Sequence, residues 1–328
     1  MKIVMTLLVR DELDVVAATL EHHLAAGVSH VIATDNTSRD GTAELLQQYA
    51  DRGVLTLIHE PATDYQQDRW VTRMARLAAT DHQADWVINS DADEFLWPLG
   101  PDGEPLPGPQ ITFADTLAAV PAEFGSVTAK RHNLVAGPGA AGSWPYRLRL
   151  RDTQALSERG TPIGPKSVHR GDPEVDVAFG NHSSSGPLLG PPVDSRPFVI
   201  LHAPDRSFEQ FERKIANGGS AVESNTGLPA EISWHWRSDF DRLQRGELRA
   251  AWESRQLTPA SAAAGMTAGT LLPERRLLGR LEHLRGQTVV PGVLDSVIEV
   301  PEIPAASAGA GTGSARPSAL RRFIGRLR

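Results

Sequence analysis

The chain of 328 residues contains no cysteine. Without a thiol there is no disulfide scaffold, no cysteine nucleophile, no thiolate zinc site and no iron–sulfur cluster. A metal bound to this chain must therefore sit on Asp, Glu, His, Asn or Gln side chains. Oxygen-rich sites of that kind favour Mg²⁺ or Mn²⁺.

Long hydrophobic runs are also missing. The apolar start of the chain ends at Val9, which is too short for the core of a signal peptide, and Arg10-Asp11-Glu12 follows it. No later run approaches the roughly 18 apolar residues that a membrane span needs. We therefore expect a cytoplasmic protein.

Positive charge is in deficit, with 33 Lys+Arg against 40 Asp+Glu and a formal net charge of -7. Nucleic-acid binders grip phosphates with clustered Lys and Arg, so we expect no nucleic-acid partner. The composition, 40% hydrophobic and 22% charged, is that of an ordinary globular protein with one or two domains.

The first hundred residues alternate between two hydrophobic periods. Strand patterns cover residues 2–9, 29–34, 54–59 and 85–90, and helical patterns cover 11–26, 41–52 and 66–82. Such alternation predicts right-handed βαβ units, and hence an α/β fold with a mainly parallel sheet flanked by helices. Ligands of these sheets bind beyond the carboxyl ends of the strands.

The remainder of the chain is less periodic. Its repeated Gly and Pro residues predict an irregular, β-containing second half, followed by helices. We expect a main domain over 1–245, made of a nucleotide-binding half (1–97) and an acceptor half (98–245), then a helical extension over 246–300 and a flexible linker with a basic tail over 301–328. The basic and apolar residues of 318–328 leave two interpretations open, a solvated end or a weak peripheral contact with anionic lipid at the inner face of the membrane. The oligomeric state stays undetermined.

Acidic residues follow each of the four expected strands. The clearest case is Asp91-Ala92-Asp93-Glu94 after the fourth strand, where two carboxylates two residues apart can hold a hard cation. The alternative is a polar turn whose acids cap a helix, but its place at a strand end favours function. Asp35 ends the second strand and is the residue there that we expect to contact a ligand.

Several motifs resemble, in order and spacing, the family 2-like glycosyltransferases of GT-A fold, in the branch related to family 92. They are Leu8-Val9-Arg10-Asp11-Glu12, His23 before Gly27-Val28, residues 35–42, residues 86–96, Lys166-Ser167-Val168-His169-Arg170, Gly180-Asn181-His182, and residues 201–207 with Gln210-Phe211 and Lys214. Together they extend over residues 1–245.

The resemblance implies a GT-A (Rossmann-like) fold and a nucleotide-sugar donor whose diphosphate sits on a divalent cation, Mn²⁺ or Mg²⁺. It further implies transfer of the sugar to a hydroxyl acceptor, a glycan, a lipid or a small molecule, with inversion. The implied metal ligands are Asp91, Asp93 and His202, and the implied donor-binding residues are Arg10, Glu12, Asp35, Asp91, Lys166 and Arg206.

The catalytic base is the least determined part of the site. An inverting transfer needs one carboxylate or His opposite the leaving group. The candidates are Glu94, Asp172, Glu174, Asp176 and His182. Asp176 and His182 are preferred.

Two other functions remain open from the sequence. A nucleotidyltransferase also uses carboxylate-bound Mg²⁺ on an α/β sheet, and would release pyrophosphate from a nucleoside triphosphate. A glycan-binding module with a decayed site would not turn over a donor at all.

Overall fold

The structure of the chain is a computed structural model, which describes residues 1–299 except 63–65, 158, 191–195 and 225–233. The expected linker and basic tail over 301–328 lie outside the described residues. None of the helices in the described part has the length and apolar character needed to cross a bilayer.

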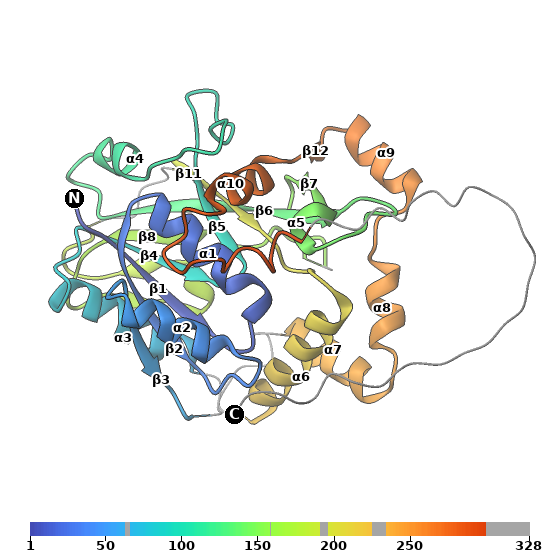
Figure 1. Cartoon of the computed structure of the whole chain (residues 1–328), viewed down its shortest axis with the longest axis horizontal. Helices are drawn as coiled ribbons and strands as arrows, with labels where there is room; N and C mark the ends of the chain where they lie inside the picture. Colours follow the sequence, from blue (N-terminus) through green and yellow to red (C-terminus); the bar gives the residue numbers. More distant parts are fainter. Residues whose placement is uncertain (63–65, 158, 191–195, 225–233, 300–328) are drawn as a thin grey trace, which may run out of the picture.

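The first half is the expected βαβ array (Figure 1). Its elements are β1 (Ile3–Val9), α1 (Leu13–Ala25), β2 (Val28–Asp35), α2 (Thr42–Asp51), β3 (Leu55–His59), α3 (Gln67–Thr80) and β4 (Trp86–Asp91). The strands pair in parallel in the order β3-β2-β1-β4. This is the 3-2-1-4 order of Rossmann-like sheets, and it confirms the expected fold class.

The register brings the acidic strand ends to one edge. Val9 of β1 pairs with Asp35 of β2, and Leu8 of β1 pairs with Asp91 of β4. Two strand spacings therefore separate Asp35 from Asp91, which is about 10 Å. A ligand of nucleotide size can touch both.

The second half extends this sheet with mainly antiparallel pairs. Its elements are β5 (Glu94–Pro98), α4 (Ala114–Ala118), β6 (Ser126–Ala136), α5 (Trp144–Arg147), β7 (Leu148–Asp152), β8 (Lys166–Arg170), the short β9 (Asp176–Val177) and β10 (Ser184–Ser185), and β11 (Phe198–His202). β8 lies antiparallel between β4 and β6, while β11 pairs in parallel with β6 and antiparallel with β5. β5 lacks a period-2 pattern because all five of its residues are buried, which explains why the sequence did not indicate it.

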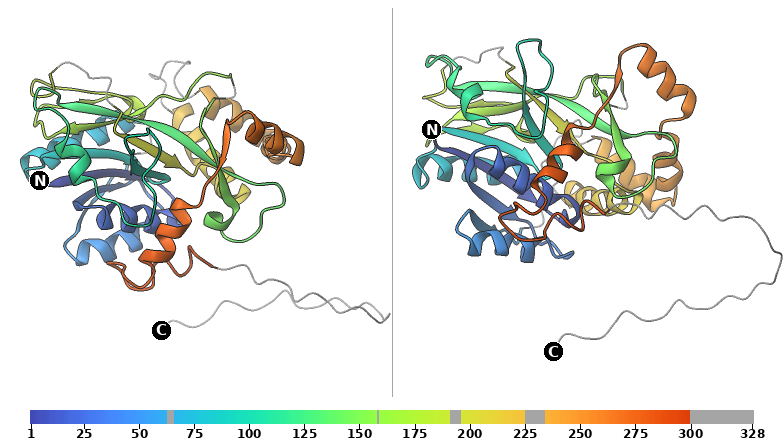
Figure 2. Two further views of the ribbon diagram at one scale, coloured as in Figure 1. Left: turned by 90° about the horizontal axis from the view of Figure 1, so that it is seen from above. Right: turned by 45° about the horizontal axis from the view of Figure 1, so that its top comes forward.

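The last part of the chain leaves the sheet and then returns to it (Figure 2). It contains α6 (Phe208–Ser224), α7 (Trp234–Gln244), α8 (Leu248–Ser254), α9 (Pro259–Thr267), β12 (Leu271–Pro273) and α10 (Arg276–Leu284). β12 pairs with β7 in the sheet. α10 packs against α1, where the buried Arg280 guanidinium donates through Nε to His22 Nδ1 at 3.0 Å.

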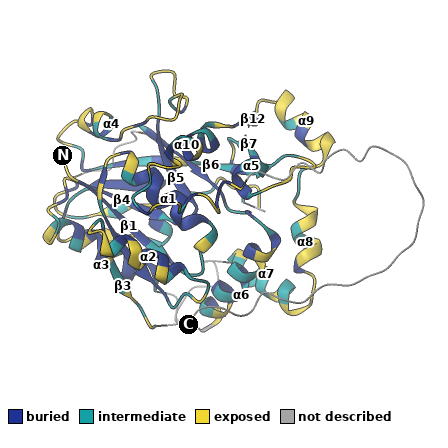
Figure 3. Ribbon diagram, in the orientation of Figure 1, coloured by how far each residue is buried: buried dark blue, intermediate teal, exposed yellow. Residues whose placement is uncertain are grey.

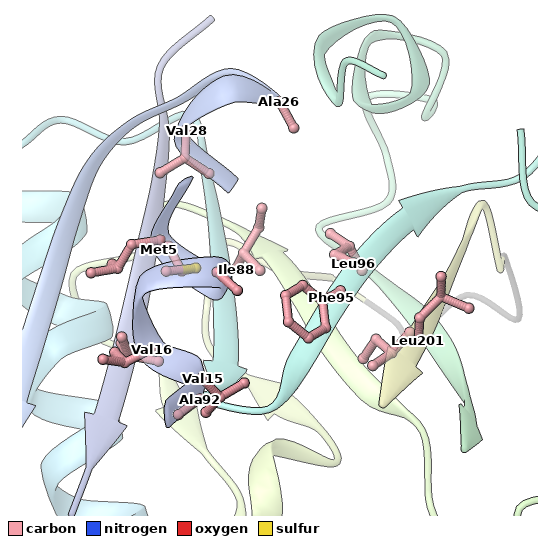
Figure 4. Close-up of a cluster of buried hydrophobic side chains, with 14 of the residues drawn as sticks. Met5, Val15, Val16, Ala26, Val28, Ile88, Ala92, Phe95, Leu96 and Leu201 are labelled. Carbon is pink, nitrogen blue, oxygen red and sulfur yellow. The ribbon is translucent and has the colours of Figure 1, made fainter. Parts of the chain in front are cut away.

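The two faces of the sheet carry separate hydrophobic clusters, and both are buried in Figure 3. The larger cluster joins α1, α2 and α10 to one face, and α3 covers the other. Figure 4 shows part of the larger cluster, in which Phe95 and Leu96 of β5 face Ile88 of β4 and Leu201 of β11. This packing fixes the turn between β4 and β5, which carries the Asp-Ala-Asp-Glu motif.

Candidate functional site

Asp93 lies in the two-residue turn between β4 and β5 and is almost fully buried. Its carboxylate is 3.0 Å from Lys214 Nζ, 3.5 Å from His202 Nε2 and 3.6 Å from an Arg206 guanidinium nitrogen. Burial acts to raise the pKa of Asp93, but these neighbours outweigh burial and hold that pKa well below its usual value. Asp93 is therefore an anion surrounded by cationic partners.

His202 belongs to a polar row that crosses three strands. Cross-strand pairing places it beside Glu94 of β5 on one side and Asn133 of β6 on the other. Its Nδ1 is 2.8 Å from Asn133 Oδ1, which can only accept, so Nδ1 carries the hydrogen. The other ring nitrogen, Nε2, is left facing Asp93.

Asp91 and Glu94 share one buried cation. Lys166 Nζ is 2.5 Å from Asp91 Oδ2 and 3.3 Å from Glu94 Oε1, and Arg131 is 3.5 Å from Glu94. Burial favours the neutral form of both acids. It raises the pKa of Glu94, whereas Lys166 outweighs it at Asp91 and lowers that pKa. The resemblance implies that Lys166 binds the donor. In the structure its ammonium group contacts Asp91 and Glu94, the first and last residues of the Asp-Ala-Asp-Glu motif.

Arg206 is held inside a second network. Its Nε donates to Asp14 at 2.7 Å, and its other nitrogens bond the Glu12 carboxylate and the Ala203 carbonyl. The guanidinium is 1% exposed. Burial raises the pKa of Glu12 even though Arg206 and Lys214 lower it. The two predicted donor-binding residues Glu12 and Arg206 therefore bind one another, which fixes the β1–α1 loop against the segment after β11.

The predicted nucleoside side of the site is formed by the ends of β1 and β2. Asp35 is 3% exposed, and its Oδ2 accepts from the Ser38 backbone at 3.4 Å, while Oδ1 is buried without a partner in the described structure. Asp11 accepts from the Arg39 backbone at 2.7 Å and from Asn217 of α6 at 2.5 Å. Arg10 has a buried Nε without a described partner. Asp35 thus offers an unused acceptor at the edge where a ligand is expected.

The two preferred base candidates lie in different surroundings. Asp176 is 72% exposed and pairs with Arg76 of α3 at 2.7 Å. His182 lies between Gly164 and Gly180, and its Nδ1 donates to the Pro165 carbonyl at 2.8 Å, so Nε2 keeps its lone pair. Desolvation lowers the pKa of His182 and keeps the ring neutral near pH 7. His182 directly follows Asn181, which bonds Asp91, and so belongs to the site's surroundings.

A divalent cation needs several oxygen or nitrogen ligands, which side chains, substrate and water can supply. Within the described part of the chain, no group of three or more His, Asp or Glu side chains is arranged to hold a metal. Asp93 and His202 do stand side by side, 3.5 Å apart, whereas Asp91 is engaged by Lys166. A carboxylate and an imidazole suit Mn²⁺, and Mg²⁺ commonly takes its other ligands from substrate phosphates and water.

Four further site residues were not assigned a role from the sequence. They are Arg131, Asn133, Asn181 and Lys214. Only Asn181 and Lys214 appeared within the motifs of the resemblance. The others lie on β6, where the aperiodic sequence gives neither the strand nor its register.

The start of the chain is similar to a known protein family. Residues 5–110 match the model of Glycosyltransferase family 92. This stretch runs from β1 through β5 and includes Asp35, Asp91 and Asp93. No curated protein matches the sequence.

Similar solved structures share little sequence with this chain. TarS from S. aureus in complex with UDP-GlcNAc is 13% identical, over 90% of this chain and 89% of that one, with a TM-score of 0.37. Glucosyl-3-phosphoglycerate synthase from Mycobacterium tuberculosis, in complex with Mn²⁺, UDP and phosphoglyceric acid, is 18% identical, over 40% and 43%, with a TM-score of 0.27. A mycobacterial protein is 18% identical, over 70% and 75%, with a TM-score of 0.35.

Proposed function

We propose that the chain is a glycosyltransferase that transfers a sugar from a nucleotide-sugar donor to a hydroxyl acceptor, and the match of residues 5–110 to the model of Glycosyltransferase family 92 supports this. We further propose that the transfer depends on a divalent cation, Mn²⁺ or Mg²⁺, and inverts the anomeric centre.

The observation that carries this proposal is the juxtaposition of Asp93 and His202. They lie more than one hundred residues apart in the sequence, and both are buried at the edge where Asp35 also ends its strand. An anionic carboxylate beside an imidazole fits a cation that is shared with phosphates. Asp35, about two strand spacings from Asp91, then suits the nucleoside.

In this proposal Asp93 and His202 would hold the cation. When bound, the cation would stabilise the negative charge that develops on the departing diphosphate. Lys214, 3.0 Å from Asp93, is placed to add to that stabilisation. Lys166 contacts both Asp91 and Glu94 and holds their side chains in place beside it.

Binding should be tested by thermal unfolding with Mn²⁺ together with each of UDP, GDP, CDP and ADP. We expect one pair to raise the unfolding temperature, and Asp93→Ala to abolish the rise because the carboxylate on the cation is lost. Asp51→Ala, at the exposed end of α2, is the matched control and should keep the rise. If no nucleotide stabilises the wild-type protein, the proposed function is wrong.

For the base we propose His182 over Asp176. The neutral ring with its hydrogen on Nδ1 can accept the proton of the acceptor hydroxyl at Nε2. His182→Ala should lower donor turnover by about 10²- to 10⁴-fold while nucleotide binding is retained. Unchanged donor turnover in His182→Ala, with loss in Asp176→Ala, would reverse the assignment.

A further inference from the structure

Asn181 occupies a turn that places its side chain against Asp91. The turn is the short 3₁₀ helix Phe179–Asn181, in which Gly180 has φ 70° and Asn181 has φ 58°. This left-handed region is open to glycine and tolerated by asparagine. The Gly180 backbone donates to Gln67 Oε1 of α3 at 2.8 Å, which ties the turn to the first half of the chain.

The orientation of the Asn181 amide is fixed by its neighbour. Asn181 Nδ2 donates to Asp91 Oδ1 at 3.2 Å, while Lys166 holds the other oxygen of the same carboxylate. An ionised carboxylate only accepts hydrogen bonds, so the NH₂ group must face Asp91. The amide oxygen is therefore turned the other way.

That oxygen is buried without a partner. Asn181 is 1% exposed, and its Oδ1 makes no hydrogen bond within the described structure. Buried acceptors are nearly always paired in native proteins, because an unpaired one keeps the full cost of losing water. An acceptor in this state beside Asp91 points to a bound group that supplies a hydrogen.

The chemistry of a nucleotide sugar limits which of its groups can donate a hydrogen bond to Asn181 Oδ1. Phosphate oxygens and the cation cannot donate a hydrogen bond, whereas the hydroxyls of a ribose or of a transferred sugar can. Asp91 lies between the predicted nucleoside contact, Asp35, and the cation pair of Asp93 and His202. A donor that spans these points carries its hydroxyls past Asp91.

We propose that Asn181 Oδ1 accepts a hydrogen bond from a hydroxyl of the nucleotide-sugar donor, which makes Asn181 a specificity-determining residue. The proposal rests on the proposed function. Through Oδ1, Asn181 would distinguish a donor that carries this hydroxyl from an analogue that lacks it. Through Nδ2, the same side chain would keep Asp91 oriented.

The test measures dissociation constants by calorimetry in the presence of Mn²⁺. The ligands are the nucleoside diphosphate that stabilises the wild-type protein, its 2′-deoxy and 3′-deoxy analogues, and the corresponding nucleotide-glucose. The variant is Asn181→Gly, since glycine accepts φ 58° without a Cβ clash. Ligand-free unfolding temperatures establish that the variant is folded, and Asn181→Ala is measured alongside it.

We expect Asn181→Gly to weaken the hydroxylated ligand about three- to ten-fold more than the analogue lacking the partner hydroxyl. A difference seen with the deoxy nucleotides assigns the hydroxyl to the ribose. A difference that appears only with the nucleotide-glucose assigns it to the sugar. Either result supports the proposal.

Asn133→Ala is the matched control, because the Asn133 oxygen already accepts from His202. It should weaken all ligands by the same factor. If Asn181→Gly also weakens every ligand equally, the proposal is overturned while the proposed function stands. If the wild-type protein binds no nucleotide, the proposed function fails, and the inference fails with it.

Discussion

At the scale of single residues, the site is built from buried ionic groups that need one another. Lys166 forms ion pairs with Asp91 and Glu94, and Lys214 forms one with Asp93. Removing one partner of such a pair leaves an uncompensated charge, which costs more than the pair itself contributes. These cations are therefore part of the ordered site before any ligand binds.

Two buried histidines outside the site contribute to the response of the protein to acid. His22 Nδ1 accepts from Arg280, and His23 Nε2 accepts from the Leu96 backbone at 3.4 Å, so each ring is neutral. Burial lowers the pKa of His22 well below its usual value and lowers that of His23 to about 4. The unfolded chain therefore takes up protons first as the pH falls below about 6.5.

We predict that the free energy of unfolding decreases between pH 6.5 and pH 5, with His23 contributing about 2 kcal/mol of the loss. The folded pKa of His23 is depressed, so its stabilisation is complete above 6.5 and is lost toward 4. Urea unfolding at several pH values measures the slope. His23→Gln should reduce it. Equal slopes in His23→Gln and wild type would contradict the assignment.

At the scale of elements, α6 matters because it carries Lys214 and Asn217 to the site. Two glycines, Gly218 and Gly219, follow directly in the same helix, although glycine lowers helix stability. A Cβ at Gly218 would overlap the Trp236 indole of α7, and one at Gly219 would clash with the Phe240 ring. The glycines allow these rings to pack on the α6 backbone, which fixes the helix beside Asp93.

We predict that Gly218→Ala destabilises the protein by about 1–3 kcal/mol, since overpacking outweighs the gain in helix propensity. The matched control is Gly279→Ala in α10, where an added Cβ would meet no atom within 4 Å. That variant should stabilise by up to about 1 kcal/mol. Denaturant unfolding of both variants checks the opposite signs. Stabilisation by Gly218→Ala would show that Trp236 does not pack there.

At the scale of the whole molecule, the segment after residue 270 completes the core of the first half. β12 extends the sheet at β7, and Leu277, Leu281 and Leu284 of α10 are buried in the larger cluster. The Glu21 carboxylate of α1 accepts from the Val289 and Val290 backbones at 3.0 and 3.2 Å. The expected boundary at 245 remains a prediction, but the chain beyond it packs on the expected main domain.

We predict that a chain ending at residue 245 loses cooperative folding, because the face of α1 under α10 becomes exposed. A chain ending at residue 299 keeps every contact described above and should unfold at the wild-type temperature. Circular dichroism during heating compares the two. A cooperative transition in the shorter chain would show that residues 1–245 form an independent unit.

Local patterns in the sequence were sufficient to predict the βαβ start of the fold and the acidic edge of its sheet. Hydrophobic periods and turn residues are local signals, so each of the first seven elements was located to within two residues. The strand-end rule then singled out Asp35, Asp91 and Asp93 without any contact information. β5 lacked such a signal because all five of its residues are buried, and a fully buried strand shows no alternation.

The partners of those acids depend on how distant parts of the chain pack together. The pairing of β5, β11 and β6 places Glu94, His202 and Asn133 in one row, and a helix far along the chain brings Lys214 to Asp93. The tertiary structure also separated the two base candidates, with Asp176 of β9 paired to Arg76 of α3 and His182 beside Asn181. These contacts depend on strand register and helix rotation, which the packing of the whole chain sets and no local pattern encodes.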